Sequence, residues 1–384
     1  MKCRFLLMVA VFFVSLHLEP TVHAQDKAEQ INVASTDWAW WRGPNRNGVA
    51  EAKQSPPLQW DDEKNVLWKT PVPGRGFGSP TVVGNRIFLA VADEVQEIQS
   101  VICYDRTTGA QLWKTDIHKG GFIFTGRQGN TRSSKASSTV ACDGKRVFIT
   151  FLNADAVYIT ALTLEGKQLW QQKVTDYMVH QGYGSSPALY GPLVIAGADN
   201  KGGGAITAYD RVTGDVVWTH KRPEKPNYPS PIILNLEGRD QLLLTGLNLV
   251  TSLDPLTGKV NWEVEGATNE CVTSIVSDGK VIVTSGGWPK DHIAVLKGDG
   301  SGEVLWENTT RVYVPSMVLH QGYLYVVTDA GMAYCHELAT GKVAWEFRLR
   351  SKFSASLVLV GDKIFAMGDD GITFIIKATP KAFE

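Results

Sequence analysis

One short element recurs six times in this sequence: a turn that ends in glycine, followed four residues later by tryptophan. The copies are Thr108-Gly109 with Trp113, Glu165-Gly166 with Trp170, Thr213-Gly214 with Trp218, Thr257-Gly258 with Trp262, Ser301-Gly302 with Trp306 and Thr340-Gly341 with Trp345. Successive tryptophans lie 39 to 57 residues apart. A repeat of roughly 40 to 50 residues holds four short strands, the size of one propeller blade. The pattern predicts an all-β chain that folds as a β-propeller of four-stranded antiparallel blades.

A second repeated feature gives the number of blades. Short apolar segments, each preceded or opened by serine, occur at Ser79, Ser138, Ser186, Ser230, Ser274, Ser316 and Ser356. The innermost strands of a propeller converge on its axis, where bulky side chains would collide, so a small residue is expected there. Seven such openings predict seven blades.

The tryptophans are interpreted as structural residues of the repeat. A seventh, on an outer-type strand at residues 65–68, has no inner strands before it. We expect all seven to pack between neighbouring blades: Trp68, Trp113, Trp170, Trp218, Trp262, Trp306 and Trp345.

The two ends of the repeat region suggest how the ring closes. The seventh serine opening is followed by sequence for three strands, up to residue 376. These strands and the Trp68 strand would together make one four-stranded blade, which removes free sheet edges. The hypothesis is a propeller domain over residues 65–384, closed by this mixed blade.

The first 24 residues have the features of a secretory signal peptide. Lys2 and Arg4 precede an apolar run, and residues 22–24 read Val-His-Ala, a small-x-Ala cleavage site. Cys3 lies ahead of the apolar run, so it is no lipoprotein cysteine. We expect residues 1–24 to be removed and the product to be periplasmic or secreted, with no transmembrane segment after cleavage. A retained N-terminal anchor is the alternative.

Residues 25–64 form an arm rich in tryptophan and proline, with Trp38, Trp40 and Trp41 leading into a Gly-, Pro- and Asn-containing turn. Dense aromatic residues in a non-periodic segment usually pack on a neighbouring surface. The arm is therefore expected to dock on the propeller rim, and a ligand site is the alternative.

Charge and cysteine content exclude some classes of function. The formal net charge is −1, so there is no basic surface for nucleic acid. Cys103, Cys142, Cys271 and Cys335 lie in four different repeats without close pairing. We interpret them as buried free thiols.

The repeated Thr-Gly-x-x-x-Trp element over roughly residues 65–376 resembles the pyrrolo-quinoline-quinone-type propeller repeat family. The stretch from Trp41 to Gly48 further resembles BamB-like exported proteins of the planctomycete type. The family resemblance implies either a quinoprotein dehydrogenase or a non-catalytic envelope propeller. Relatives of this kind commonly have eight blades, so the chain is either a shorter version or an eight-blade fold lacking one repeat.

The residues that the resemblance implies for quinone chemistry are not recognisable in this sequence. Quinoprotein dehydrogenases hold the quinone (PQQ) with adjacent cysteines, a calcium ion bound by Glu and Asn, and an Asp base. No two cysteines are adjacent here, and no calcium ligands are assignable. The histidines show no pair at zinc-ligand spacing. We expect no catalytic, cofactor-binding or metal-binding residues.

One long loop and one set of equivalent positions are the remaining candidates for binding. The loop spans residues 116–135 and carries His118, Lys119, Arg127 and Arg132; a solvated surface loop is the alternative. The equivalent positions precede each inner strand, where they would ring the mouth of the axis: Phe77, Lys135, Tyr183, Tyr228, Glu270, Tyr313 and Phe353. Such a ring suits a planar or peptide-like ligand, with simple packing of the blade tops as the alternative.

The leading hypothesis is an exported, non-catalytic propeller that acts as a binding or assembly scaffold for a protein partner in the envelope. The alternatives are a quinone-dependent dehydrogenase with a degenerate site and a carbohydrate-binding propeller. The sequence names neither the ligand nor the oligomeric state.

Overall fold

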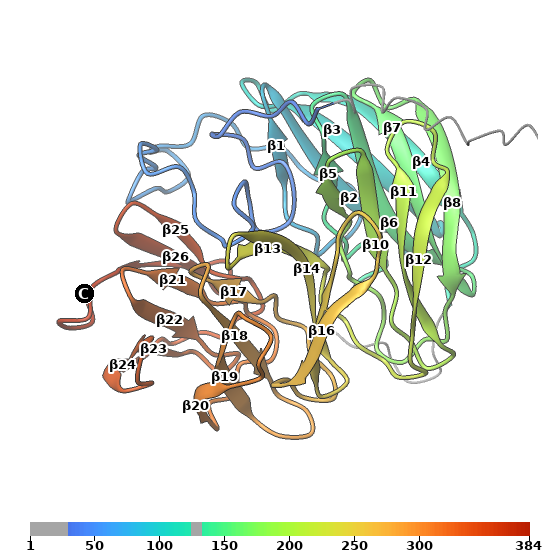
Figure 1. The fold of residues 1–384 in the computed structure, drawn as a ribbon. Coiled ribbons are helices and arrows are strands. Elements are labelled where there is room, and N and C mark those ends of the chain that lie inside the picture. Colours follow the sequence, from blue (N-terminus) through green and yellow to red (C-terminus); the bar gives the residue numbers. More distant parts are fainter. Residues whose placement is uncertain (1–29, 124–132) are drawn as a thin grey trace, which may run out of the picture.

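The computed structural model describes residues 30–123 and 133–384, and the regular elements in these ranges are all β-strands. They form seven antiparallel sheets arranged as the blades of a propeller (Figure 1). Blades 1 to 6 have four strands each and blade 7 has three, and within every blade the strands pair in chain order. The predicted seven-bladed β-propeller is therefore confirmed. The expected signal peptide, residues 1–24, lies outside the described residues.

The first four blades run from residue 81 to residue 265. Blade 1 is β1 (Thr81–Val83), β2 (Arg86–Asp93), β3 (Ile98–Asp105) and β4 (Gln111–Lys119). Blade 2 is β5 (Ala141–Cys142), β6 (Arg146–Asn153), β7 (Ala156–Thr163) and β8 (Gln168–Asp176). Blade 3 is β9 (Ala188–Tyr190), β10 (Leu193–Gly197), β11 (Gly204–Asp210) and β12 (Val216–Arg222). Blade 4 is β13 (Ile232–Leu236), β14 (Arg239–Gly246), β15 (Leu249–Leu253) and β16 (Val260–Glu265).

The last three blades continue the same order. Blade 5 is β17 (Val276–Ser277), β18 (Val281–Gly286), β19 (His292–Lys297) and β20 (Val304–Asn308). Blade 6 is β21 (Val318–His320), β22 (Tyr323–Val327), β23 (Met332–Glu337) and β24 (Val343–Arg348). Blade 7 is β25 (Val358–Val360), β26 (Lys363–Met367) and β27 (Thr373–Lys377). Within residues 30–123 and 133–384, no helix has the length and apolarity that crossing a bilayer requires.

The repeat tryptophan of one blade lies on the turn of the next. Trp218 of blade 3 donates its indole N–H to the Pro255 carbonyl of blade 4 at 3.2 Å. It covers Gly258, which has φ +68° and whose Cβ, if present, would lie 2.4 Å from the Trp218 ring. Glycine is required at this position for two reasons: the turn needs positive φ, and the indole occupies the space that a side chain would take.

The same contact joins the other blades. The indoles of five further tryptophans donate to backbone carbonyls of the following turn: Trp68 to Arg106, Trp113 to Leu164, Trp170 to Arg211, Trp306 to Leu338 and Trp345 to Thr379. Trp262 also lies on a turn glycine, Gly300, but its indole nitrogen has no hydrogen-bond partner among the described residues.

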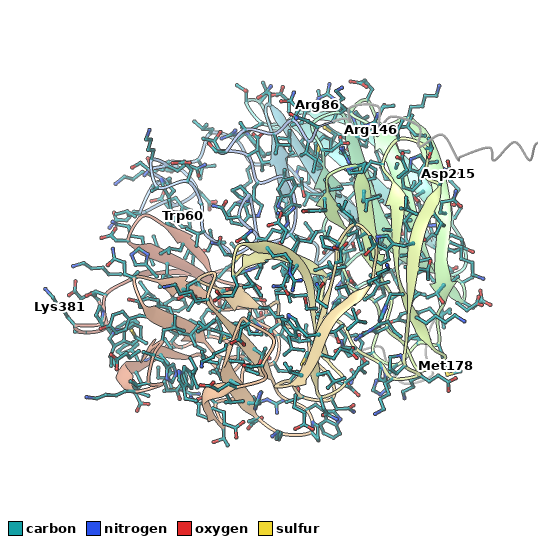
Figure 2. All side chains as sticks on the ribbon, viewed as in Figure 1. Trp60, Arg86, Arg146, Met178, Asp215 and Lys381 are labelled. Atoms are coloured by element: carbon teal, nitrogen blue, oxygen red, sulfur yellow. The ribbon has the colours of Figure 1, made fainter. Side chains whose placement is uncertain are left out.

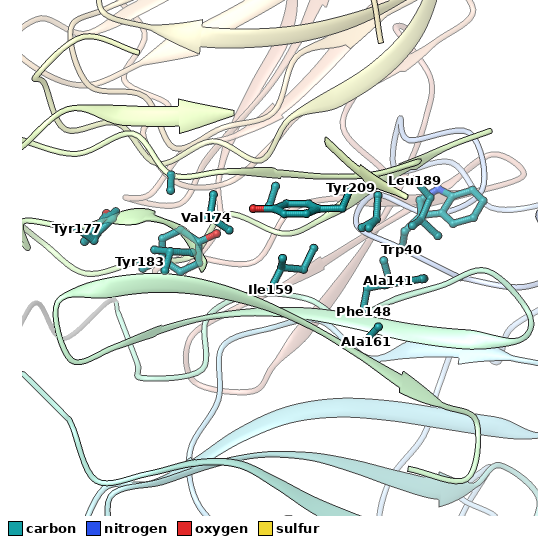
Figure 3. Close-up of a cluster of buried hydrophobic side chains, with 14 of the residues drawn as sticks. Trp40, Ala141, Phe148, Ile159, Ala161, Val174, Tyr177, Tyr183, Leu189 and Tyr209 are labelled. Atoms are coloured by element: carbon teal, nitrogen blue, oxygen red, sulfur yellow. The ribbon is translucent and has the colours of Figure 1, made fainter. Parts of the chain in front are cut away.

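The hydrophobic core is divided into clusters, several of which lie between adjacent blades. Figure 3 shows the cluster between blades 2 and 3, in which Phe148 and Ile159 face Leu189 and Tyr209. Trp40 of the arm closes one end of this cluster. Figure 2 shows the described side chains on the ribbon of the seven blades.

The ring-closure hypothesis based on Trp68 is wrong in this structure. Residues 65–69 form no strand, and blade 7 remains a three-stranded sheet. The Trp68 segment is held instead by blade 1, because its indole bonds to Arg106 and the Thr70 hydroxyl donates to the Gly109 carbonyl at 2.7 Å.

The arm connects the first and last blades in another way. Trp38 pairs with Val82 of β1, and Ala50 N–H donates to the carbonyl of Leu359 in β25 at 2.8 Å. In Figure 1 the blue N-terminal segment lies between β25 and β1. The arm therefore spans the inner strands of the propeller, and the expected position on the rim is not what the structure shows.

Candidate functional site

A cavity of about 680 Å³ opens on the axis of the propeller. Most of its wall comes from the segments that precede the inner strands of blades 1 to 7, and the arm and the turn after β26 supply the rest. The lining residues lie at positions 41, 77, 133, 137, 181–184, 186, 228, 230, 272, 313–314, 352, 354–356 and 367–369. The volume falls in the range of small-ligand sites in proteins.

Four of the seven residues predicted to ring the axial mouth line this cavity. They are Phe77, Tyr183, Tyr228 and Tyr313, from blades 1, 3, 4 and 6. Phe77 is 47% exposed, whereas the Tyr183 side chain is buried and donates its hydroxyl to the Gly197 carbonyl at 3.0 Å. The structure therefore brings aromatic side chains of several blades to one cavity.

The other three predicted ring residues are not among those that line the cavity. Phe353 is fully buried and packs on Phe374 of blade 7, with ring centroids 5.8 Å apart. Its neighbours Lys352 and Ser354 face the cavity instead, so the prediction was one residue out of phase at this blade. Lys135 donates to the Ile123 carbonyl at 2.5 Å and so turns toward its own loop.

Glu270 is 5% exposed and is not among the residues that line the cavity. Its Oε1 is 3.8 Å from Nδ1 of His180, and the same nitrogen is 2.9 Å from the hydroxyl of Tyr228. Burial raises the pKa of Glu270, and the nearby His180 opposes that rise. Burial also raises the pKa of Tyr313 to about 12, so this phenol, which is neutral at pH 7 even without the shift, keeps its proton well into the alkaline range.

Trp41 of the arm also lines the cavity, a position that the sequence did not predict. Its indole N–H donates to the hydroxyl of Ser274 in blade 5 at 2.7 Å. The next residue, Arg42, is 3% exposed and donates to the carbonyls of Leu357 and Met317. These contacts hold Trp41 at the axis. Apart from its aromatic residues, nothing in the sequence of the arm and its turn indicated that Trp41 lies at the axis.

The repeated serines have a role that their small size alone does not explain. Ser186 N–H donates to the hydroxyl of Ser230 at 2.8 Å, from blade 3 to blade 4. Equivalent bonds run from Thr139 to Ser186, from Ser274 to Ser316 and from Ser316 to Ser356. Each hydroxyl accepts a backbone N–H that would otherwise be buried without a partner. We name Ser186, Ser230, Ser274, Ser316 and Ser356 the serine ring.

The long loop contributes little to the site as far as it is described. His118 lies between Phe151 and Tyr158 of blade 2, with ring centroids 6.2 and 5.3 Å away. Arg127 and Arg132 lie outside the described residues. Ser133, at the end of the loop, lines the cavity.

The donor set of the cavity does not fit a quinone held with calcium. Among the described lining residues Asp369 is the one carboxylate and Lys352 the one cation. No three His, Cys, Asp or Glu side chains of the described residues come together as a metal site. Cys103, Cys142, Cys271 and Cys335 are buried free thiols, each in a different blade or the segment leading into it.

Solved structures of similar fold include a BamB and a dehydrogenase. BamB from Moraxella catarrhalis superimposes with a TM-score of 0.54 at 18% identity, over 74% of this chain and 82% of that one. The quinohemoprotein alcohol dehydrogenase from Comamonas testosteroni gives a TM-score of 0.62 at 15% identity, over 91% of this chain and 72% of that one. At these identities the likeness shows the fold alone.

Sequence comparison gives a relative and a family. A polyvinylalcohol dehydrogenase from Sphingopyxis sp. (strain 113P3) is 26% identical over 222 residues, which is 54% of this chain. The chain spans 31% of that relative's length. The family described as outer membrane protein assembly factor BamB matches residues 97–286 and 290–379. With most of its repeats matched, the chain belongs to this BamB family of propellers.

Proposed function

We propose that this chain is an exported, non-catalytic scaffold that binds an extended segment of an envelope protein at the edge of blade 7. The observation that carries the proposal is the three-stranded sheet of that blade. In blades 1 to 6 the third strand pairs on both sides, whereas β27 pairs with β26 alone. Backbone N–H and C=O groups along such an edge bind an added strand by β-augmentation.

The edge of β27 differs from the outer edges of the other blades. In blades 1 to 6 the pairing of the third strand with the fourth is interrupted by a register shift, as between Ala208 and Tyr209. Such bulges twist an edge away from further pairing. The pairing of β27 with β26 is regular over all five residues, as is the pairing of the second and third strands in blades 1 to 6. In blade 7 no bulged fourth strand of the described residues covers the third strand, so its regular edge beside Ile375 is a template for another strand.

The side chains of β27 also favour an added strand. Its sequence is Thr373-Phe-Ile-Ile-Lys377, so a single charge stands at its end. Lys377 N–H donates outward to the carbonyl of Glu384 at 2.9 Å. Because backbone groups alternate along a strand, the N–H of Ile375 points to the same side. The position next to Ile375 is where a partner strand would bond.

Site-specific photo-crosslinking tests this scaffold function in cells that make the protein. A photoreactive amino acid in place of Thr373 reports on the edge of blade 7, and the same group in place of Glu346 on β24 serves as the matched control. We expect the variant with the photoreactive group at position 373 to give one predominant protein adduct. The variant with the group at position 346 should give no adduct of the same mass. The added substitution Ile375→Pro should abolish the adduct, because proline removes the outward N–H. Identical adducts at both positions, or an adduct that survives Ile375→Pro, would contradict the proposal.

A quinone-dependent dehydrogenase is the second candidate, favoured by the named polyvinylalcohol dehydrogenase relative. The cavity residues argue against it, since they offer one carboxylate and no cysteine pair. Purified protein mixed with pyrrolo-quinoline quinone and calcium should therefore show no dye-linked oxidation of alcohols or sugars. Turnover that depends on both additions would reverse the order of the two candidates.

A further inference from the structure

We propose that the axial cavity binds an uncharged carbohydrate, in the form of a short oligosaccharide segment. The site lies at the axis and adjoins the start of β27, because Met367 lines it and pairs with Thr373, but its ligand does not depend on the protein-binding function proposed above. Three properties of the cavity carry the inference: its aromatic walls, its buried hydroxyl groups and its charge.

The aromatic walls offer flat apolar surfaces to a ligand. Phe77 lines the cavity and is 47% exposed, although an aromatic side chain of this size is usually buried, and the guanidinium of Arg75 lies 4.7 Å from its ring centroid. Tyr228 and Tyr313 line the same cavity from blades 4 and 6, and Trp41 lines it from the arm. A pyranose ring presents its C–H groups on one face, and that face packs on an aromatic ring while the hydroxyl groups stay at the rim.

The buried hydroxyl groups offer hydrogen bonds to such a rim. Ser186 and Ser230 line the cavity and are 3% and 7% exposed. Each oxygen accepts one backbone N–H of the preceding blade. Neither hydroxyl hydrogen has an acceptor among the described residues, so both remain able to donate. A buried donor without a partner is costly, and a ligand oxygen would satisfy it.

The charge of the cavity favours a neutral ligand. Lys352 and Asp369 are the charged side chains among the described residues that line it, and they have opposite signs. A ligand with several carboxylates or phosphates would need more cations than this. The volume of about 680 Å³ also suits two or three sugar rings rather than a single small solute.

Isothermal titration calorimetry on the full chain tests the inference with named probes. Cellotriose, maltotriose and N,N′,N″-triacetylchitotriose represent neutral oligosaccharides, and citrate represents a compact polyanion. Each is titrated to about 10 mM, ten times the Kd of a millimolar site. We expect saturable binding of at least one trisaccharide and none of citrate. Silence from all three sugars, or binding of citrate alone, would overturn the inference.

Variants locate any binding that is seen. Phe77→Ala removes an exposed ring from the cavity without touching the core, and Tyr313→Ala removes a second ring. Either change should weaken binding about tenfold or more. Trp60→Ala is the matched control, since Trp60 is 44% exposed on the arm and lies outside the cavity (Figure 2). If the Phe77→Ala and Tyr313→Ala proteins bind the sugar with the same affinity as the parent protein, the sugar binds elsewhere and the proposal is wrong. Melting curves confirm that each variant is folded. The crosslink at Thr373 should be unchanged in all of them.

Discussion

The indole nitrogen of Trp41 lies 2.7 Å from the hydroxyl oxygen of Ser274, although 233 residues separate the two in the chain. Ser274 belongs to the serine ring, and its own N–H donates to Ser316 of the next blade at 3.0 Å. The arm thus places an aromatic side chain against a serine of this set at the axis. The contact makes the arm part of the propeller and gives the axial cavity one of its walls.

Removing this contact should destabilise the propeller. Trp41→Ala should lower the free energy of unfolding by about 2–4 kcal/mol, because a half-buried aromatic side chain is lost from the axis. Ser274→Ala should cost about 1–2 kcal/mol, because the indole N–H is left without its acceptor. Urea unfolding followed by circular dichroism measures both. Trp60→Ala, a substitution at an exposed tryptophan, should stay within about 0.5 kcal/mol of the parent. A Trp41→Ala protein as stable as the parent would mean that the arm is not docked.

The contact between tryptophan and turn glycine predicts a difference between two glycine substitutions. Gly258 and Gly238 both have positive φ, at +68° and +76°, so alanine is strained at either position. A Cβ on Gly258 would lie 2.4 Å from the Trp218 ring, whereas a Cβ on Gly238 meets nothing within 4 Å. Gly238→Ala should cost about 1 kcal/mol and Gly258→Ala about 1–3 kcal/mol more. Chemical denaturation of the two variants checks this, and equal costs would refute the steric explanation.

The blades were predictable from the sequence because their signal is periodic. The tryptophan of one repeat lies on a turn glycine of the next six times, although in blade 5 that glycine is Gly300 and not the Gly302 of the sequence pattern. This pattern predicted the architecture, and the seven serine openings predicted the number of blades. The serines were found for the same reason, but their hydrogen bonds were not. A serine that is merely small and one that accepts a neighbour's N–H look identical in sequence, as Ser230 shows.

The cavity was predictable in part, and the failures have local causes. Tyr228 and Tyr313 line it as the repeat alignment suggested, whereas Phe353 points into the blade and Lys352 takes its place. A one-residue change of phase reverses the direction of a side chain in extended backbone. Trp41 escaped prediction because the arm has no repeat to align it with. Its position depends on contacts to residues more than 200 positions away.

Arg42 should be essential for holding the arm across blades 6 and 7. Its guanidinium is buried, bonds the Leu357 and Met317 carbonyls at 2.9 and 2.5 Å, and has a pKa lowered by burial to about 9. Arg42→Met should cost about 3–5 kcal/mol, because buried carbonyls lose their donors. Arg42→Lys should recover only part of the loss, because a single ammonium group lacks the fork that reaches both blades. Thermal unfolding ranks the three proteins. An Arg42→Lys protein equal to the parent would show that charge alone is needed.

His118 should make the folded state sensitive to mild acid. Burial lowers its pKa from 6.5 to about 4, and its Nε2 has no hydrogen-bond partner among the described residues. Between these two pH values the unfolded chain binds a proton at this site and the native protein does not, so stability falls as the pH drops from about 6.5 toward 4. His118→Phe keeps an aromatic ring beside Phe151 and Tyr158 but cannot be protonated. Between pH 6.5 and 4 the His118→Phe protein should therefore lose about 1–2 kcal/mol less stability than the parent. This value is reduced because the ring is partly exposed. Urea unfolding at pH 6.5 and 4.5 measures the change, with Tyr158→Phe as the control that should keep the parent's pH dependence. If the His118→Phe protein loses as much stability as the parent, the site titrates normally and the imidazole is not desolvated.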